Sequence, residues 1–373
     1  MTTTKNNEHK KLNVPNLRFP EFQGEWENCT LGDLCNVLMC KRILASQTNT
    51  EEGVPFYKIG TIGNAPDAYI SKELFDDYKT KYNYPHKGEV MITCAGTVGK
   101  CVIYDGKDAY FQDSNIVWID NPSQCISNSF LYHLLAKVDW RKLNSTTIIR
   151  IYNDDLRNLK LSYPQIEEQQ KISRLLSFLD ERIATQNKII DKLQSLIKGI
   201  AQKIVHSNKT NVRLSECVEC SSSTLQESDV CEHGAYPVYG ANGIVGYLDN
   251  YNTKGEAVYI IKDGSGVGTV SYVTGKCSAT GTLNTLQAKE GYSLQYLYYL
   301  LKVFNFEPYK TGMAIPHIYF KDYGKAKFFC PSYIEQLQYA QSLSAIDSKL
   351  LVEKNILTSL SMQKQYLLRQ MFI

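Results

Sequence analysis

Two long helical segments with a heptad repeat constrain the fold of this chain more than any other feature. The first runs from Gln165 to Ser207 behind Pro164, and the second runs from Pro331 to the C-terminus. Apolar residues recur in the first at alternating spacings of four and three, the pattern of a left-handed coiled coil. Each segment would form about 60 Å of helix at about 1.5 Å per residue, whereas helices of globular domains average about three turns. We therefore expect the two to bury each other, with two ordinary core helices as the alternative.

The second segment repeats the first at a constant offset of 167 residues (331 − 164). The register transfers directly, and it pairs Ile172 with Tyr339. A polar residue, Gln186 or Glu353, occupies the same position in each copy, where polar groups commonly fix register at a cost in stability. The predicted apolar seam comprises Ile172, Leu176, Leu179, Ile183, Ile190 and Leu193 in the first copy and Leu343, Ile346, Leu350, Leu357 and Leu360 in the second.

The rest of the chain repeats in the same order. Short β-branched or aromatic runs bounded by turn residues predict strands at 54–60, 88–94, 99–105 and 114–120, and a helix follows at 129–144. In the second half, 236–248 and 255–273 correspond to these strands and 292–305 to the helix. The fold class is thus α+β, a tandem duplication of a mixed β-rich domain followed by a long helix, with the two helices pairing as an antiparallel coiled coil. We expect an N-terminal arm, a first β-rich domain, a central helix, a second β-rich domain and a C-terminal helix at 1–29, 30–164, 165–207, 208–331 and 332–373.

The composition narrows the class of protein without naming a function. A net charge of +3 does not indicate a nucleic-acid binder by itself, although a nearly neutral total can conceal a local basic surface. No stretch of 18 apolar residues and no signal sequence is present, so we expect a soluble cytoplasmic protein away from membranes. The 11 cysteines are then expected to be reduced thiols. Whether Cys217, Cys220, Cys231 and His233 bind zinc stays open, because their spacing is unlike that of common zinc sites.

Motifs for catalysis are absent from the sequence. There is no G-x-x-x-x-G-K-[ST] loop, and the six histidines form no H-x-x-x-H pair and no set with serine and an acid. Gly264, Gly266 and Gly268 lack both the G-x-G-x-x-G spacing and a strand-to-helix setting, so they predict a tight hairpin. We therefore predict no catalytic residue and no metal ligand.

The duplicated pattern resembles the specificity (S) subunit of type I restriction-modification enzymes over essentially the whole chain. The resemblance rests on the paired Pro-x-x-x-Glu-Gln helix entries at Pro164 and Pro331, and on the Leu/Ile-Asp steps at Asp180 and Asp347. It rests also on YPVYGANGIVGY at 236–247 and on VPNLRFPEFQGEW near the N-terminus.

The resemblance implies a non-catalytic subunit with two target recognition domains, each binding one half of a bipartite, asymmetric site in double-stranded DNA. The helices would set the spacing and dock two modification (M) subunits, and restriction (R) subunits would complete the enzyme. No cofactor is expected in this chain; S-adenosylmethionine, ATP and Mg are expected in the partner subunits. The alternatives are a coiled-coil scaffold whose β-rich domains bind protein or glycan ligands, and an enzyme with an unrecognised site.

Reading of bases requires polar side chains on loops that enter a groove, together with Lys and Arg on phosphates. Arg150 and His317 occupy equivalent repeat positions, and five lysines between 302 and 327 against two acids form a +3 stretch (5 − 2). The candidate DNA-binding residues are Lys58, Lys79, Lys81, Arg150, Tyr152 and Asn153 in the first domain and Asn242, Lys262, Ser265, His317 and Tyr319 in the second.

Overall fold

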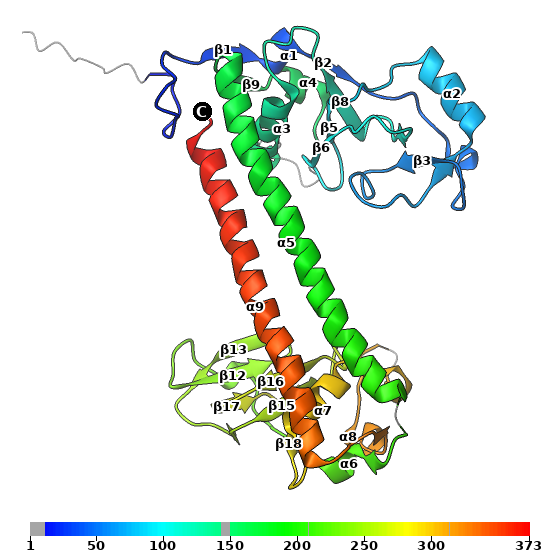
Figure 1. The fold of residues 1–373 in the computed structure, drawn as a ribbon, viewed down its shortest axis with the longest axis vertical. Helices are drawn as coiled ribbons and strands as arrows, with labels where there is room; N and C mark the ends of the chain where they lie inside the picture. Colours follow the sequence, from blue (N-terminus) through cyan, green and yellow to red (C-terminus); the bar gives the residue numbers. More distant parts are fainter. Residues whose placement is uncertain (1–11, 143–149, 208, 313) are drawn as a thin grey trace, which may run out of the picture. The chain divides into compact units, whose positions relative to one another are not determined.

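The computed structural model describes residues 12–142, 150–207, 209–312 and 314–373 (Figure 1). The chain divides into two compact units, each considered by itself below. Unit 1 comprises Met1–Ala184 with Thr358–Ile373, and unit 2 comprises Thr185–Leu357. Each unit therefore contains part of both long helices. Residues 1–11 of the expected arm, and the end of the helix expected at 129–144, lie outside the described residues.

Unit 1 is built on a four-stranded sheet and a smaller three-stranded one. The larger has the order β2-β8-β5-β6 and the smaller the order β4-β3-β7, in which β3 and β7 are parallel. The strands are β1 (Glu27–Thr30), β2 (Asn36–Leu38), β3 (Val54–Tyr57), β4 (Tyr69–Ile70), β5 (Val90–Thr93), β6 (Cys101–Ile103), β7 (Tyr110–Phe111), β8 (Ile116–Asp120) and β9 (Lys160–Tyr163). The helices are α1 (Leu31–Leu34), α2 (Lys72–Lys81), α3 (Asn128–Lys137), α4 (Asn153–Arg157) and α5 (Ile166–Ser207).

Unit 2 repeats this plan. Its main sheet has the order β11-β18-β15-β16, which matches that of unit 1 strand for strand, and in its second sheet, β13-β12-β17-β14, β12 and β17 are again parallel. The strands are β10 (Val212–Arg213), β11 (Val218–Ser222), β12 (Tyr236–Gly240), β13 (Gly243–Leu248), β14 (Thr253–Lys254), β15 (Ala257–Ile261), β16 (Val270–Val273), β17 (Lys276–Ala279), β18 (Leu283–Ala288) and β19 (Lys327–Phe328). The helices are α6 (Leu214–Cys217), α7 (Leu294–Leu301), α8 (Phe320–Tyr323) and α9 (Tyr333–Gln370). The predicted duplication and fold class are confirmed.

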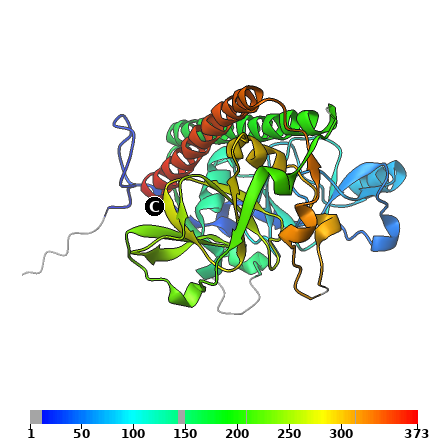
Figure 2. The ribbon, with the colours of Figure 1, turned by 90° about the horizontal axis from the view of Figure 1, so that it is seen from below.

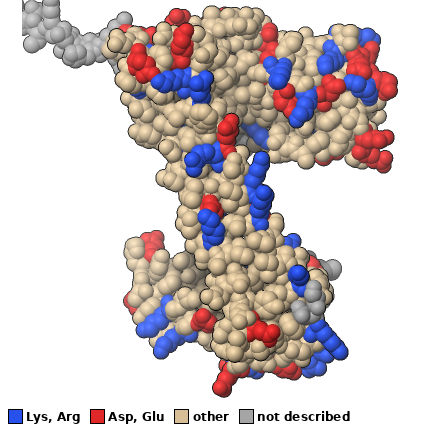
Figure 3. Space-filling view, in the orientation of Figure 1, with Lys and Arg blue, Asp and Glu red and all other residues tan. Residues whose placement is uncertain are grey.

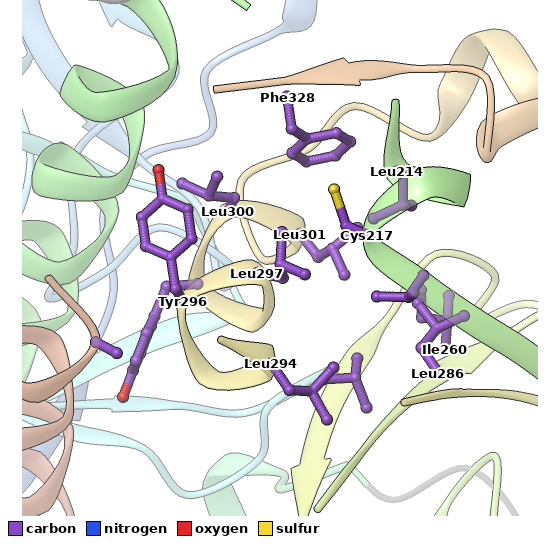
Figure 4. Packing of buried hydrophobic residues seen from close by; sticks show 14 of the residues in the cluster. Leu214, Cys217, Ile260, Leu286, Leu294, Tyr296, Leu297, Leu300, Leu301 and Phe328 are labelled. Atoms are coloured by element: carbon purple, nitrogen blue, oxygen red, sulfur yellow. The ribbon is translucent and has the colours of Figure 1, made fainter. Parts of the chain in front are cut away.

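The core of unit 2 shows how each sheet is tied to its helices. In Figure 4, Leu294, Leu297 and Leu301 of α7 lie among side chains from the sheet and from the segments that flank it. Tyr296, Tyr299 and Leu300 of α7 are buried as well. The same cluster includes Ile260 and Leu286 from the central strands and Leu343 and Leu350 from α9.

The long helices α5 and α9, of 42 and 38 residues, pack antiparallel within each unit and lie side by side in Figures 1 and 2. Their polar seam residues meet in unit 2, where Gln186 Nε2 donates to the Glu353 carboxylate and to the Glu353 carbonyl oxygen at 3.0 Å. In unit 1, Lys364 of α9 forms an ion pair with Asp180 of α5. The seam residues named above are buried at Ile172, Leu176, Leu179, Ile190, Leu343 and Leu350, and half-buried at Ile183, Leu193, Ile346, Leu357 and Leu360.

Three local expectations differ from the structure. The helix expected at 129–144 ends at Lys137, because Val138 adopts an extended conformation, and a 3₁₀ turn follows at Trp140–Lys142. Helix α2, which was not predicted, begins behind Ser71, whose Oγ accepts the Leu74 N–H as an N-cap. Tyr339, the counterpart of Ile172, is exposed, and the neighbouring Ala340 is buried in its place.

Candidate nucleic-acid interface

Unit 2 contains a surface cavity of about 590 Å³ that brings three of the predicted DNA-binding residues together. These are Lys262, His317 and Tyr319. The cavity lies where β15 ends, and its other lining residues are Cys220, Ser221, Ser222, Asp263, Asn284, Ile318, Phe320 and Lys321. Lys262 and Lys321 face a single carboxylate, so the lining carries a positive balance that suits an anionic ligand.

Backbone hydrogen bonds hold the segment around His317 against the end of β15. Ile318 N–H donates to the Lys262 carbonyl at 2.9 Å, and Gly264 N–H donates to the Pro316 carbonyl at 3.1 Å. His317 also exchanges backbone hydrogen bonds with Thr311, at 2.8 and 2.9 Å. This pairing sets His317 opposite Asp263, as in a short antiparallel ladder.

This backbone arrangement brings the side chains of Asp263 and His317 together. His317 Nδ1 lies 2.5 Å from Asp263 Oδ1, and both side chains are 36% exposed. Tyr319 is 49% exposed, its ring lies nearly parallel to that of His317 with centroids 6.4 Å apart, and the Lys321 ammonium lies 5.2 Å from its centroid. Below them, Asn284 is buried and bonded, since Ser222 Oγ donates to its oxygen and its amide nitrogen donates to Tyr323 Oη. The polar side chains that a ligand can reach are therefore those of Asp263, His317, Tyr319 and Lys321, whereas that of Asn284 is buried.

Unit 1 holds the equivalent segment in the same way. Ile151 N–H donates to the carbonyl of Cys94, the residue that follows β5, at 2.9 Å. Arg150 then stands where His317 stands in unit 2, with Nη2 at 3.4 Å from the Ser114 carbonyl oxygen, and Tyr152, 60% exposed, stands where Tyr319 stands. Each unit thus presents a nitrogen-bearing side chain and an exposed tyrosine beside the end of its central strand.

A glycine turn lies next to this position in both units. Gly99 has φ +82, and a Cβ there would lie 2.1 Å from Trp140 Cδ1; Gly268 has φ +90, and a Cβ there would lie 3.0 Å from Phe306 Cβ. Both turns connect antiparallel strands, β5 to β6 and β15 to β16. The prediction of a hairpin at Gly264–Gly268 is confirmed, and the glycines serve close packing under an aromatic ring.

Both halves of the sequence match the model of one protein family, described as "Type I restriction modification DNA specificity domain", over residues 23–195 and 206–362. This chain belongs to that family.

Named relatives agree with this assignment. A putative type I restriction enzyme specificity subunit of Haemophilus influenzae is 49% identical over 168 residues, which are 45% of this chain and 43% of the relative. The putative MjaX specificity subunit of Methanocaldococcus jannaschii is 24% identical over 209 residues, 52% of this chain and 49% of the relative. The matched part of the chain thus spans about half the length of these relatives.

Solved structures share the fold of this specificity-domain chain. The crystal structure of a type I restriction-modification S subunit from M. genitalium aligns with a TM-score of 0.67 at 19% identity, covering 96% of this chain and 99% of that one. A structure reported for complex assembly and conformational transition of the type I R-M system aligns with a TM-score of 0.51 at 16% identity, covering 92% and 96%.

The other lysines predicted in unit 1 lie in α2 or directly after β3. Lys58, Lys79 and Lys81 form ion pairs with acidic neighbours, Asp67, Asp108 and Asp77 respectively. Lys79 and Lys81 belong to α2, and Lys79 lines a separate cavity of about 550 Å³ in unit 1 with His86 and Glu89. On the face shown in Figure 3, basic and acidic groups are interspersed over unit 1.

The remaining candidates occupy turns or a helix start. Asn242 lies exposed in the turn between β12 and β13, and Ser265 lies exposed in the glycine turn. Asn153 is the first residue of α4. Sequence reasoning missed Asp263, because 54 residues separate it from His317 and its structural counterpart, the residue after Cys94, is Ala95.

The four residues whose zinc binding the sequence left open do not form a metal site in the described part of the chain. Within the described ranges, no group of three or more His, Cys, Asp or Glu side chains could hold a metal ion. Cys217 Sγ instead lies 3.9 Å from Cys330 Sγ in the core, and Cys231 is exposed beside β13. Among the helices that the structure describes, none is long and apolar enough to cross a membrane.

Proposed function

We propose that this chain is the DNA-specificity subunit of a type I restriction-modification enzyme, and that each unit binds one half of a bipartite site in double-stranded DNA. One observation carries the proposal. Two units with the same sheet order present different side chains at the same place, Arg150 with Tyr152 and His317 with Tyr319. Recognition of an asymmetric site requires different base-contacting side chains in the two units, because each half-site offers a different pattern of hydrogen-bond donors and acceptors.

The long helices support the spacing role. Helix α5 has 42 residues and α9 has 38, about 60 Å each at about 1.5 Å per residue, whereas one turn of duplex is about 34 Å. A helix of this length is long enough to separate two half-sites by a turn or more. Inserting four residues between Leu193 and Ile197 would shift one end of α5 by about one helical turn. We expect it to change the spacing of the recognised site or to abolish assembly, without changing the bases recognised.

Partner subunits supply the chemistry in this proposal. Two M subunits dock on the outward faces of the helix pair and carry S-adenosylmethionine, and R subunits carry ATP and Mg. In unit 2 these faces expose large apolar side chains, which commonly mark contact surfaces when they cluster. They are Ile189 and Leu196 of α5 and Leu351, Val352 and Ile356 of α9.

The test is the sequence that becomes methylated. The full chain is expressed with its M subunit in a host that lacks both, and the methylated motif is read by methylome sequencing. We expect a bipartite motif, Arg150→Ala to relax one half only, and His317→Ala to relax the other half only. Glu290→Ala, on the exposed turn of unit 2 between β18 and α7, is the control for substitution as such.

Two outcomes contradict the proposal. One is the absence of any motif that depends on this chain, and the other is a change in both halves from either single substitution. The salt dependence of ligand binding by the purified complex also separates the proposal from the alternative of a scaffold for protein or glycan ligands. DNA binding weakens steeply with salt, whereas recognition of a neutral glycan or protein surface does not.

A further inference from the structure

The contact between Asp263 and His317 determines which ring nitrogen of the histidine carries the proton, in addition to the position of the ring. An ionised carboxylate only accepts hydrogen bonds, so a ring nitrogen that pairs with it must carry the proton. His317 Nδ1 lies 2.5 Å from Asp263 Oδ1 and therefore carries the ring proton whenever the ring is neutral. The other nitrogen, Nε2, is then left with its lone pair as a hydrogen-bond acceptor.

The surroundings leave this acceptor available to a ligand. In the described part of the chain, His317 Nε2 has no hydrogen-bond partner, and the imidazole lines the unit 2 cavity. The backbone of His317 is bonded to Thr311 on one side and that of Ile318 to Lys262 on the other, so the segment is fixed on both sides. The ring of Tyr319 lies nearly parallel to the imidazole, with the two centroids 6.4 Å apart.

We propose that Asp263 is a positioning residue that holds His317 in the tautomer whose Nε2 accepts a hydrogen bond from an exocyclic amino group of a base, adenine N6 or cytosine N4, in the major groove. This inference rests on the proposed function, and it deepens it by naming the chemistry that unit 2 reads. In the major groove these amino groups are donors, whereas guanine O6 and thymine O4 are acceptors at the corresponding places. A locked acceptor therefore discriminates an amino base from the keto base of the same ring type.

Unit 1 provides an internal contrast. Arg150 occupies the equivalent position and carries only donors, which suit guanine O6 and N7. In unit 1 the residue that follows Cys94, the counterpart of Lys262, is Ala95, so the acidic partner belongs to the half with the histidine. Of Arg150 and His317, only the histidine has nitrogens that can be either donor or acceptor, and it is the histidine that has a carboxylate partner.

The experiment measures base preference at one position of the site. The full chain is purified with its M subunit, and His317→Ala first identifies the position whose preference depends on His317. Dissociation constants are then measured for duplexes that differ there only by adenine against guanine, or cytosine against thymine. We expect Asp263→Ala to reduce this discrimination on the order of tenfold, because the ring can then present either tautomer. Asp322→Ala is the matched control, because it removes a nearby carboxylate of α8 that pairs with Lys325 rather than with His317.

The outcomes separate this inference from the proposed function. Unchanged discrimination in Asp263→Ala, or an equal loss in Asp322→Ala, overturns the role of Asp263 while specific binding by the wild-type complex stands. No site-specific binding by the wild-type complex overturns both. Nitrogen-15 spectra of the imidazoles of the full chain, assigned with His317→Gln, test the tautomer directly: a proton on Nδ1 alone supports the inference, and a proton on Nε2, with or without one on Nδ1, contradicts it.

Discussion

The starts of the two long helices differ more than their sequences suggest. Glu168, in the first turn of α5, is fully buried and receives two hydrogen bonds from Arg18, at 2.8 and 2.7 Å. Its repeat counterpart Glu335 is exposed and accepts hydrogen bonds from Ser332 at the start of α9. The N-terminal arm makes the difference, because it covers the helix start in unit 1 and has no counterpart ahead of β10.

The adjacent glutamine, by contrast, does the same work in both units. Gln169 Oε1 accepts the N–H of Ser127, the N-cap of α3, and Gln336 Oε1 accepts the N–H of Ser293, the N-cap of α7. Each glutamine also donates to the carbonyl of the proline that precedes its helix. A repeated motif can therefore contain one residue with a constant role and one whose role depends on which other segment reaches it.

Removing the arm's arginine should give the largest effect and should be confined to unit 1. Arg18→Ala leaves a buried carboxylate without its partner, which costs about 3–5 kcal/mol of unfolding free energy. Glu335→Ala in unit 2 removes only an exposed capping contact, worth about 0.5–1 kcal/mol. Hydrogen exchange of the first turns of α5 and α9, together with denaturant unfolding, measures both. Equal losses would mean that the arm does not distinguish the two helix starts.

A buried histidine should make unit 1 sensitive to acid. Burial lowers the pKa of His133 to about 4 from an ordinary 6.5, so the ring stays neutral in the fold and is protonated more readily after unfolding. Stability is then complete above about pH 6.5 and falls as the pH drops toward 4, by at most about 3 kcal/mol. His133→Gln should flatten this loss, and His86→Gln, at a histidine whose side chain is 85% exposed, should not. Unfolding midpoints between pH 7 and 4 measure it.

Substitution of Gln169 and of Gln336 should destabilise unit 1 and unit 2 by similar amounts, unlike substitution at the two glutamate positions. Gln169→Ala and Gln336→Ala each leave the N–H of an N-cap serine without its acceptor and remove a hydrogen bond to the preceding proline carbonyl. We expect each change to lower the free energy of unfolding of its unit by about 1–3 kcal/mol. Exchange protection at the N-termini of α3 and α7 reports each loss locally. A loss in one unit only would contradict the shared role.

The smallest effect is expected at the polar seam position. Lys349, and then Gln186, lower the pKa of the Glu353 carboxyl below its usual range. The stabilisation is therefore present above the ordinary glutamate pKa and is lost as the pH falls through the lowered value. Glu353→Gln should remove this acid dependence and change stability little at pH 7, as measured by thermal unfolding. A fall in the unfolding temperature of the wild type between pH 7 and pH 3 that is smaller in the variant would agree, and an equal fall in both would contradict the prediction.

The sequence predicted the features that repeat. Heptad spacing located both helices and their apolar seam, and the offset of 167 residues (331 − 164) aligned the strands and the pair Arg150 and His317. Contacts that occur once could not be obtained in this way. Arg18 reaches Glu168 across 150 residues, and Asp263 reaches His317 across 54, with no equivalent in the other copy to reveal either. Helix α2 was missed because it lies where the two units diverge.

A duplicated chain faces the hazard that identical registers permit exchange between molecules. The middle of the helix pair opposes this, because an amide lies opposite a carboxylate, Gln186 against Glu353. Two α9 helices from different molecules, aligned in the same antiparallel register, would bring two Glu353 carboxylates together in a buried seam, where like charges are costly. One unlike pair at the centre of the seam therefore favours α5 against α9 and disfavours association of two α9 helices from different molecules.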